Sequence, residues 1–181
     1  HVVLTGKLPN LKQLKEQERV DAPKKQISPY KSVKYVHVKN KTTSAGEDLL
    51  FYNGYGGFSA NGHEYVIRLQ TDPDTQGLRF PPAPWINVIA NPDFGFLTTE
   101  KGSSYSWSKN SRENKLTPWS NDTVLDPSGE AIYIRDEDEK LFWSPMPQPV
   151  PGSADYEIRH GHGYSTYRSK TMNIEQKVSI W

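Results

Sequence analysis

The stretch Asn61-Gly-His-Glu-Tyr-Val-Ile-Arg-Leu69 indicates the fold class of this chain. Its opening Asn-Gly pair is typical of a tight turn, and Tyr65, Ile67 and Leu69 then recur at every second position. A period of two residues is the period of a β-strand, because successive side chains of a strand point to opposite faces of a sheet. The stretch therefore predicts a turn followed directly by a strand.

Similar short runs follow along the chain, with turn signals between them. Ile86, Val88 and Ala90 again alternate with their neighbours. The further strand-like runs are 94–98, 104–108, 131–135, 140–144, 156–160, 164–168 and 174–181. Asn-Gly, Asn-Pro, Asp-Pro and Pro-Gly pairs separate them. Short strands at regular intervals, with little helical pattern, predict an all-β fold, namely an antiparallel β-sandwich that is expected to be incomplete.

The first 48 residues have a different character. Leu8, Leu11 and Leu14 fall on one stripe of a helix, so we predict a short amphipathic helix over about Pro9–Val20. A Lys-, Pro- and Ser-rich linker over 21–34 should follow it. The predicted parts are thus an N-terminal arm and linker over 1–48 and the β-sandwich domain over 49–181.

The composition narrows the classes of function. The chain has 181 residues, of which 34% are hydrophobic and 12% aromatic, enough for one domain whose core depends on aromatic side chains. Its 22 basic and 21 acidic residues leave a net charge of +1, which does not favour nucleic acid or an anionic membrane as a partner. The absence of cysteine excludes disulfides and thiolate chemistry. No apolar run reaches the length of a membrane span, so no direct membrane insertion is expected.

The segment Asn110–Asp122 is unusually polar. It contains three amides, two acids, two bases and one Trp, and Leu116 is its only aliphatic residue. Because it has no apolar face at the helical or the strand period, it predicts a long loop. Amide, carboxylate and guanidinium groups bind sugar hydroxyls, and an aromatic ring stacks on the C–H face of a sugar. The candidate sugar-binding residues are Arg112, Asn114, Trp119, Asn121 and Asp122.

Each candidate also has a purely structural interpretation. Asn, Ser and Thr side chains commonly bond their own backbone in loops. Arg112 can form a surface ion pair with Glu113 or Asp122, and Trp119 can belong to the core. From the residues alone, the structural interpretation of this loop comes ahead of sugar contact.

Two other groups of residues invite a chemical interpretation. The glycines of Asn53–Phe58 lie at no strand-to-helix junction, so a turn is expected rather than a phosphate-binding loop, with Tyr55 and Phe58 filling the core. His160 and His162 would share one face of a strand. No third ligand lies at a metal-binding spacing, so a hydrogen-bonded or surface pair is preferred to a metal site.

The acidic residues do not suggest a catalytic pair. Asp136–Glu139 ends a predicted strand and precedes Lys140, which is typical of a solvated hairpin tip rather than of glycosidase carboxylates. Glu130 begins a strand and can contact the polar loop, with no sign that it is an acid catalyst. We therefore predict no catalytic residue and no metal ligand in this chain.

Several motifs, taken in their order along the chain, resemble those of one enzyme family. They are Asn53-Gly-Tyr-Gly-Gly-Phe58, Asn61–Ile67, Pro84-Trp-Ile-Asn-Val-Ile-Ala-Asn-Pro92, Phe94-Gly-Phe96, the polar loop, Gly129–Asp136, Trp143-Ser-Pro145 and Arg159-His-Gly-His-Gly-Tyr164. In this order they resemble the N-terminal β-domain of glycoside hydrolase family 94, formerly glycosyltransferase family 36. That family includes cellobiose, chitobiose and 1,2-β-oligoglucan phosphorylases and the C-terminal region of cyclic β-1,2-glucan synthases. The resemblance covers residues 49–181.

The resemblance implies a β-supersandwich that packs against an (α/α)6 barrel. The barrel carries the general-acid Asp and binds inorganic phosphate, a co-substrate expected outside this chain, and no other cofactor is implied. The sandwich shapes the active-site entrance, so a β-linked gluco-oligosaccharide, the missing barrel and a second copy in a homo-oligomer are the expected partners. The implied location is cytoplasmic, for a free enzyme or for the cytoplasmic part of a membrane-bound synthase. Because the sandwich of the family continues past the position of Trp181, a truncated and inactive piece is expected.

Two other classes of function stay open from the sequence. One is a freestanding carbohydrate-binding module without a catalytic partner, and the other is an interaction module whose sugar site is vestigial. A module that closes its own core should be a stable monomer. A truncated sandwich should instead expose an apolar face and open strand edges, and should self-associate.

Overall fold

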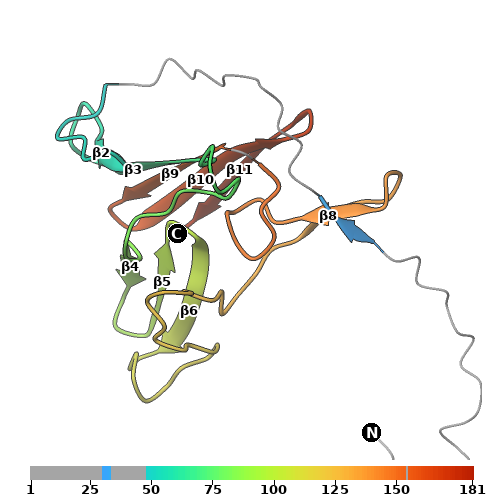
Figure 1. The fold of residues 1–181 in the computed structure, drawn as a ribbon. Coiled ribbons are helices and arrows are strands. Elements are labelled where there is room, and N and C mark those ends of the chain that lie inside the picture. The colour runs from blue at the N-terminus through green and yellow to red at the C-terminus, as the bar shows by residue number, and fades with distance from the viewer. Residues whose placement is uncertain (1–29, 34–47, 154) are drawn as a thin grey trace, which may run out of the picture.

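The computed structural model describes residues 30–33, 48–153 and 155–181. These residues form strands, turns and loops, and no helix is found among them. The strands belong to three sheets (Figure 1). The helix predicted over Pro9–Val20 lies outside the described residues.

The largest sheet has five strands in the spatial order β11-β10-β9-β3-β2. In chain order they are β2 (Gly56–Phe58), β3 (Tyr65–Gln70), β9 (Asp155–Gly161), β10 (Tyr164–Thr171) and β11 (Ile174–Ile180). All neighbouring strands in it are antiparallel. The strand predicted from the opening stretch is β3, which begins shortly after the Asn61-Gly62 turn.

One face of this sheet forms the main core. Ile67 lies opposite Ile158, which in turn lies opposite Tyr167, and all three are fully buried. Leu69 and Tyr156 extend the same apolar face by one more pair. The period of two that predicts β3 thus places its alternate side chains in the core. Burial of each large apolar side chain there stabilises the fold by roughly 1.5–3 kcal/mol.

The second sheet lies beside the first and is also antiparallel. Its strands, in spatial order, are β4 (Asn87–Ala90), β5 (Phe94–Thr99) and β6 (Gly102–Ser108). One of its faces carries a smaller cluster of Leu97, Tyr105 and Trp107. A Cβ at Gly95 would come within 2.4 Å of the Trp107 ring. The indole can approach β5 this closely only because Gly95 lacks a side chain.

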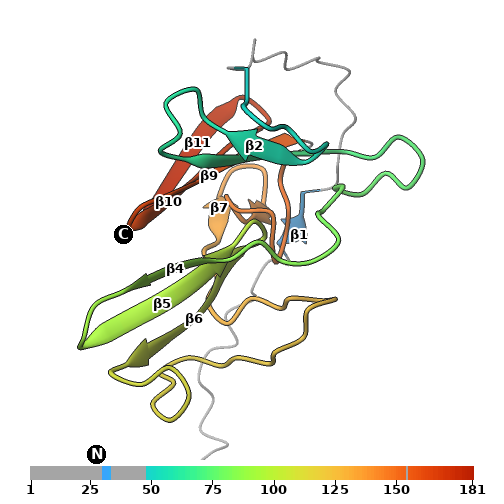
Figure 2. The ribbon, with the colours of Figure 1, turned by 90° about the vertical axis from the view of Figure 1, so that its left-hand side faces the viewer.

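Polar side chains join the two sheets. Asn87 Nδ2 on β4 lies 2.9–3.1 Å from two carbonyl oxygens of the β9–β10 hairpin and from Ser165 Oγ. Deeper in the interior, the buried Tyr167 hydroxyl donates to the Thr99 carbonyl oxygen at 2.6 Å. The two sheets form separate layers (Figure 2), so the predicted antiparallel sandwich is confirmed.

A third, small sheet projects from the sandwich (Figure 1). It consists of β1 (Lys31–Ser32), β7 (Ile134–Asp136) and β8 (Leu141–Trp143), with β8 in the middle. The turn between β7 and β8 is the predicted acidic hairpin tip, in which Asp136 Oδ1 accepts hydrogen bonds from the N–H groups of Asp138 and Glu139. β1 was not predicted, because two residues without a periodic pattern carry no strand signal. It lies within the stretch predicted as a linker and pairs in parallel with β8.

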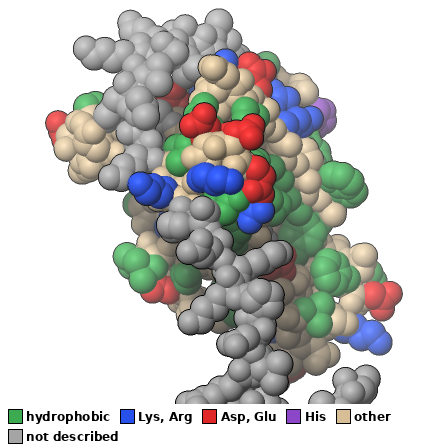
Figure 3. Space-filling view, turned by 90° about the vertical axis from the view of Figure 1, so that its right-hand side faces the viewer, with side chains coloured by type: hydrophobic (Ala, Val, Ile, Leu, Met, Phe, Trp, Pro, Cys, Tyr) green, Lys and Arg blue, Asp and Glu red, His purple; other side chains and the backbone are tan. Residues whose placement is uncertain are grey.

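Charged side chains on this projecting hairpin are paired with one another. Arg135 bonds Glu137, which also accepts a hydrogen bond from the Tyr30 hydroxyl. The Arg135 guanidinium lies 4.5 Å from the centre of the Tyr30 ring, so the aromatic ring attaches the start of β1 to the hairpin. Among the described residues on this side of the molecule, acidic and basic side chains are interspersed (Figure 3).

Two expectations about side-chain placement are wrong. Phe58, expected in the core, is 42% exposed, because β2 is an edge strand, and its aromatic ring packs edge-on against the Tyr65 ring. His162, expected to share a strand face with His160, lies in the turn between β9 and β10. Gly163, at φ +80°, provides the left-handed conformation that this turn needs.

Candidate functional site

The polar loop Asn110–Asp122 begins directly after β6 and first runs back along that strand. Lys115 forms an isolated antiparallel bridge with Trp107, and the Leu116 N–H donates to the Ser106 carbonyl oxygen at 2.9 Å. The segment is a loop, as predicted, but it is attached to the edge of the second sheet.

The first part of the loop is a self-contained turn. Asn110 Oδ1 accepts hydrogen bonds from the backbone N–H groups of Arg112 (2.9 Å) and Glu113 (3.0 Å). The Asn114 N–H donates to the Asn110 carbonyl oxygen at 3.0 Å. The Arg112 side chain is 89% exposed, and its Nε lies 3.3 Å from Glu113 Oε1. The ion pair anticipated as the structural alternative for Arg112 is therefore present, at a position where such pairs stabilise little.

Trp119 is a partly exposed aromatic ring rather than a core residue. It stacks on Tyr105, with the ring centres 5.1 Å apart and the planes inclined by 25°. Lys115 Nζ lies 5.7 Å from the centre of the indole. Trp119 remains 44% exposed, so Tyr105 holds the ring in place while part of it faces solvent.

The end of the loop is ordered by Asp122. Its Oδ1 accepts hydrogen bonds from the N–H groups of Leu125 and Val124, each at 2.9 Å. These bonds hold the pKa of Asp122 below its usual range, because N–H donors favour the charged carboxylate. Asn121 has φ +49°, a left-handed conformation that Asn tolerates better than most residues. The backbone around both side chains is therefore well defined.

Trp119, Asn121 and Asp122 line a shallow hollow, whose floor includes Leu97 and Thr99 of β5. Thr98, which lies between these two residues in the chain, contacts Tyr167 of the first sheet, so Leu97 and Thr99 are on the face of the second sheet that points away from the first. The volume of the hollow is about 60 Å³, well below the roughly 300 Å³ at which pockets for small molecules begin. A sugar would therefore lie across the hollow rather than inside it.

The structure thus brings three of the five predicted residues together. Arg112 and Asn114 do not line the hollow, because they belong to the preceding turn. Sequence reasoning missed the apolar part of the site, where Ile86 and Leu97 lie beside the loop. Their alternating pattern marks them as sheet residues, but only the path of the loop brings them to the hollow.

Hydrogen bonds also hold the base of the loop. Thr117 Oγ1 accepts from the Ser106 N–H at 2.8 Å, and Ser106 Oγ donates to Glu130 Oε1 at 2.8 Å. The predicted contact of Glu130 with the loop is thus made through Ser106. Gly129 lies so close to β6 that a Cβ there would be 1.9 Å from the Ser104 carbonyl oxygen. Only glycine fits this crossing point without displacing backbone.

A family model matches most of the chain. Residues 63–181 correspond to the family described as Glycosyl hydrolase 94, supersandwich domain. The chain belongs to this family. The matched region of the supersandwich includes the polar loop and both large sheets, apart from the edge strand β2.

Three curated relatives are similar to this supersandwich. It is 44% identical over 131 residues, 72% of this chain, to the cyclic beta-(1,2)-glucan synthase NdvB of Rhizobium meliloti (strain 1021). It is 32% identical over 130 residues, 70% of this chain, to the N,N'-diacetylchitobiose phosphorylase of Vibrio proteolyticus, and 35% identical over 117 residues, 63% of this chain, to that of Vibrio furnissii. The matches cover 4%, 15% and 14% of these three relatives, so the chain spans a small part of their length.

Two buried titratable side chains lie elsewhere in the supersandwich. Glu100 is fully buried, its Oε2 accepts a hydrogen bond from the Trp85 N–H at 2.8 Å, and burial raises its pKa. His160 Nδ1 lies 2.8 Å from Ser165 Oγ, and burial lowers the pKa of His160 to about 4. The described residues contain no group of three His, Cys, Asp or Glu side chains that could hold a metal ion. They also contain no helix long and apolar enough to cross a membrane.

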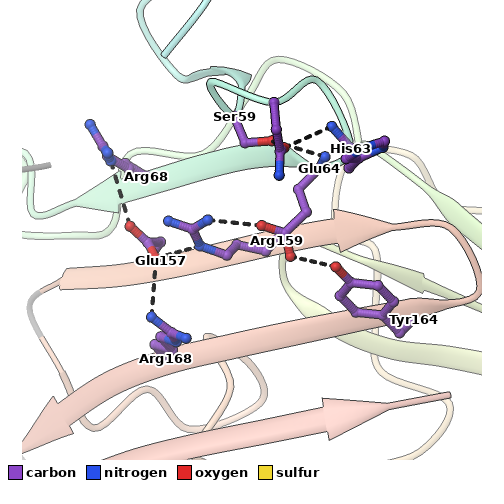
Figure 4. Close-up of polar contacts among 9 residues, drawn as sticks. Ser59, His63, Glu64, Arg68, Glu157, Arg159, Tyr164 and Arg168 are labelled. Atoms are coloured by element: carbon purple, nitrogen blue, oxygen red, sulfur yellow. Dashed lines mark hydrogen bonds and ion pairs between the residues drawn. The ribbon is translucent and has the colours of Figure 1, made fainter. Parts of the chain in front are cut away.

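The outer face of the five-stranded sheet of the supersandwich carries a row of ion pairs (Figure 4). Arg159 on β9 lies 2.8 Å from Glu64 and 2.8 Å from Glu157. The Tyr164 hydroxyl donates to Glu64 at 2.6 Å. Partial burial acts to raise the pKa of Glu64, but the hydrogen bonds from Tyr164 and Arg159 outweigh it and hold that pKa below its usual range.

Proposed function

We propose that this supersandwich is the non-catalytic, carbohydrate-contacting part of an enzyme that cleaves or builds β-linked gluco-oligosaccharides. The names of its relatives refer to a cyclic β-(1,2)-glucan and to N,N'-diacetylchitobiose. One observation carries the proposal: the half-exposed Trp119 ring stands beside Asn121 and Asp122 at a shallow hollow.

The groups at this hollow suit a sugar. The exposed part of the Trp119 ring offers an apolar surface to the C–H face of a pyranose. Asn121 can both donate to and accept from hydroxyls, and Asp122 is an acceptor. Stacking on Tyr105 and the turn at Asp122 already restrain these groups, so little conformational entropy is lost when a ligand binds.

The carboxylates at the hollow support a non-catalytic role. A glycosidic general acid needs a raised pKa so that it stays protonated near neutral pH. The pKa of Asp122 is instead held low, and Asp126 Oδ2 accepts a hydrogen bond from Thr99 Oγ1 at 2.7 Å. On this proposal the general acid and the site for inorganic phosphate come from the partner barrel, outside this chain.

The oligomeric state and the location of the complete enzyme are two further points of the proposal. Homodimerisation through the sandwich and a cytoplasmic location remain parts of the proposal. Both follow from the family resemblance rather than from any contact among the described residues.

Kinetics of the complete enzyme test the proposal. Trp119→Ala removes the ring, and Asn121→Gly removes the amide while keeping a residue that accepts φ > 0. Each should raise KM for the oligosaccharide about tenfold at unchanged kcat, because a contact made equally in the ground and transition states affects binding alone. Arg112→Ala should have a smaller effect, since Arg112 does not line the hollow.

Glu139→Ala is the matched control for these variants. It removes an exposed charge at the tip of the β7–β8 hairpin and should leave KM and kcat unchanged. If KM stayed unchanged in both Trp119→Ala and Asn121→Gly, the supersandwich would not contact the sugar at this hollow.

A further inference from the structure

A second hollow lies on the outer face of the five-stranded sheet, beside the row of ion pairs. It is lined by Asp48, Leu49, Tyr52 and Arg68, and its volume is about 380 Å³. Pockets for small molecules typically measure roughly 300–1,000 Å³. This hollow therefore has room for a sugar ring, whereas the hollow at Trp119, at about 60 Å³, does not.

The chain before β2 folds over the sheet and forms one wall. Leu50 exchanges two backbone hydrogen bonds with Phe58, of 2.8 and 2.9 Å. This close crossing depends on Gly57, because a Cβ there would lie 2.6 Å from the Leu50 carbonyl oxygen. Gly57 lies opposite the fully buried Val66. Two residues further along β3, Arg68 forms the opposite wall.

The lining combines the three kinds of group that recognise a sugar. Arg68 supplies guanidinium N–H donors, and Asp48 supplies carboxylate acceptors for hydroxyl pairs. Tyr52 is 55% exposed and supplies an aromatic ring beside the aliphatic Leu49. The polar loop offers the same combination, but here it lines a larger space.

The row of ion pairs holds Arg68 in place. Arg68 Nε lies 3.7 Å from Glu157 Oε2, and only 27% of the Arg68 side chain is exposed. Glu157 is fixed in turn by Arg159 at 2.8 Å and by Arg168 at 4.0 Å (Figure 4). A side chain restrained in this way loses less entropy on binding than a free surface arginine.

The charges around the hollow favour a neutral ligand. Among the described residues, Asp48, Glu64 and Glu157 are acidic and Arg68, Arg159 and Arg168 are basic, so these six charges balance. A phosphate or another anion would meet these carboxylates and gain little net attraction. A polyol can use both donors and acceptors without a net Coulomb cost.

The backbone next to Tyr52 is strained. Phe51 has φ +53° and is 87% exposed, so packing around its side chain does not compensate for the left-handed conformation. Such conformations are strained for bulky residues and persist where the surrounding structure fixes the backbone. Because Phe51 directly precedes Tyr52, this conformation determines where the Tyr52 ring stands.

We infer that this hollow is a second carbohydrate-binding site, which takes one or two units of a neutral β-linked gluco-oligosaccharide. Tyr52 stacks on the sugar ring, and Arg68 and Asp48 bind its hydroxyls. The inference rests on the proposed carbohydrate function of the supersandwich, but it uses different residues on the other sheet. The two hollows lie on opposite outer faces of the sandwich, so one short ligand cannot occupy both.

Titration of the isotope-labelled 181-residue chain carrying Ile174→Lys, a change that limits association through the β11 edge, tests this inference by NMR. The probes are β-1,2-linked glucotriose, β-1,4-linked glucotriose and inorganic phosphate, each up to about 10 mM, where a millimolar site is largely filled. At least one triose should shift the amide signals of Leu49, Tyr52 and Arg68, and phosphate should not.

Variants then assign the contacts. Tyr52→Ala and Arg68→Lys should each weaken triose binding at least about tenfold, because they remove the ring and the planar donor fork, respectively. Tyr52→Phe keeps the ring and should retain most of the affinity. Lys170→Ala is the matched control, because Lys170 on β10 pairs with Glu175 and belongs neither to the row of ion pairs nor to the lining of the hollow, and affinity should stay within about twofold.

The outcomes separate this site from the hollow at Trp119. Triose shifts confined to 119–122, equal shifts by phosphate, or equal losses in Lys170→Ala and Arg68→Lys would each overturn the inference. If Trp119→Ala abolished binding while the Tyr52 variants bound normally, the proposed function would stand without a second site. If no triose shifted signals at either hollow, both proposals would fail for this chain.

Discussion

His160 shows how a polar side chain is accommodated inside this sandwich. Asn87 Nδ2 donates to Ser165 Oγ, so the Ser165 hydroxyl can direct its own hydrogen to His160 Nδ1. His160 Nε2, in contrast, is buried and has no hydrogen-bond partner among the described residues. Burial lowers the pKa of His160 to about 4, because a charged imidazole would lie in the low-dielectric space between the sheets.

The contribution of His160 to stability should therefore fall as the pH is lowered from about 6.5 to about 4, whereas Glu100, whose pKa is raised by burial, contributes the opposite trend above the usual carboxyl range. An unfolded His titrates near 6.5 and the folded one near 4, so the unfolded state binds more protons across this interval and stability rises with pH. The full effect is on the order of 3 kcal/mol. Urea unfolding at several pH values between about 7 and 4 measures it.

Two variants separate His160 from the other groups. His160→Gln should flatten this pH dependence, whereas His162→Gln, in the exposed hairpin turn, should leave it intact. Glu64 and Asp122 have lowered pKa values, so their stabilisation is lost only at lower pH. An unchanged slope in His160→Gln would show that another group titrates.

Residue type predicted some roles in the polar loop and not others. Asn110 and Asp122 each close a turn with their own side chain, as short acceptor side chains commonly do. The position of Trp119 was not predictable, because Tyr105 meets its ring only after the loop has returned along β6. Whether the sugar contacts predicted for these residues occur is left to the kinetic test.

The predicted runs correspond to strands β3 to β11, whereas the two short strands β1 and β2 were not predicted. β3 and β9 both show apolar residues at every second position and both lie at the centre of a sheet. β7 begins at Ile134, although the predicted run begins at Ala131. Exposed residues such as Ile132, at 45%, imitate a strand pattern without packing against a sheet.

Asn87 docks β4 on the end of the β9–β10 hairpin. Removing the Asn87 side chain should destabilise this end of the hairpin and leave the other end of the sheet unchanged. Asn87→Ala leaves two backbone carbonyl oxygens and Ser165 Oγ without this donor, at a cost of about 1–3 kcal/mol. Amide hydrogen exchange should accelerate at Ser165 more than at Tyr156, near the other end of the sheet.

Asn91→Ala provides the matched control for this docking. Asn91 Oδ1 accepts hydrogen bonds from Asp93 and Phe94 in the β4–β5 turn, so its effect should stay local to that turn. Equal acceleration of exchange at Ser165 and Tyr156 in Asn87→Ala would contradict a local docking role.

The molecule as described has an open side. β11 is an edge of the five-stranded sheet, and Ile174 and Trp181 are 45% and 82% exposed. Unpaired edges and exposed apolar residues favour association with another chain. The self-association expected from the sequence would therefore take place at the β11 edge.

This chain should self-associate as its concentration rises through the micromolar range, which sedimentation velocity measures directly. Ile174→Lys places a charge on the β11 edge and should shift the population toward monomer. Val124→Lys, at a residue that is 82% exposed but distant in sequence from that edge, should not. A monomer at every concentration would instead favour the freestanding module.

By itself, the sequence determined the all-β class, most strand positions, the turn residues and the family. These properties depend on patterns a few residues long, such as the period of two and the Asn, Asp and Gly pairs at turns. Only the tertiary structure decided which side chains meet. Arg159 pairs with Glu64, 95 residues away, and Arg68 shares a hollow with Tyr52, because strand register and burial, not local pattern, choose long-range partners.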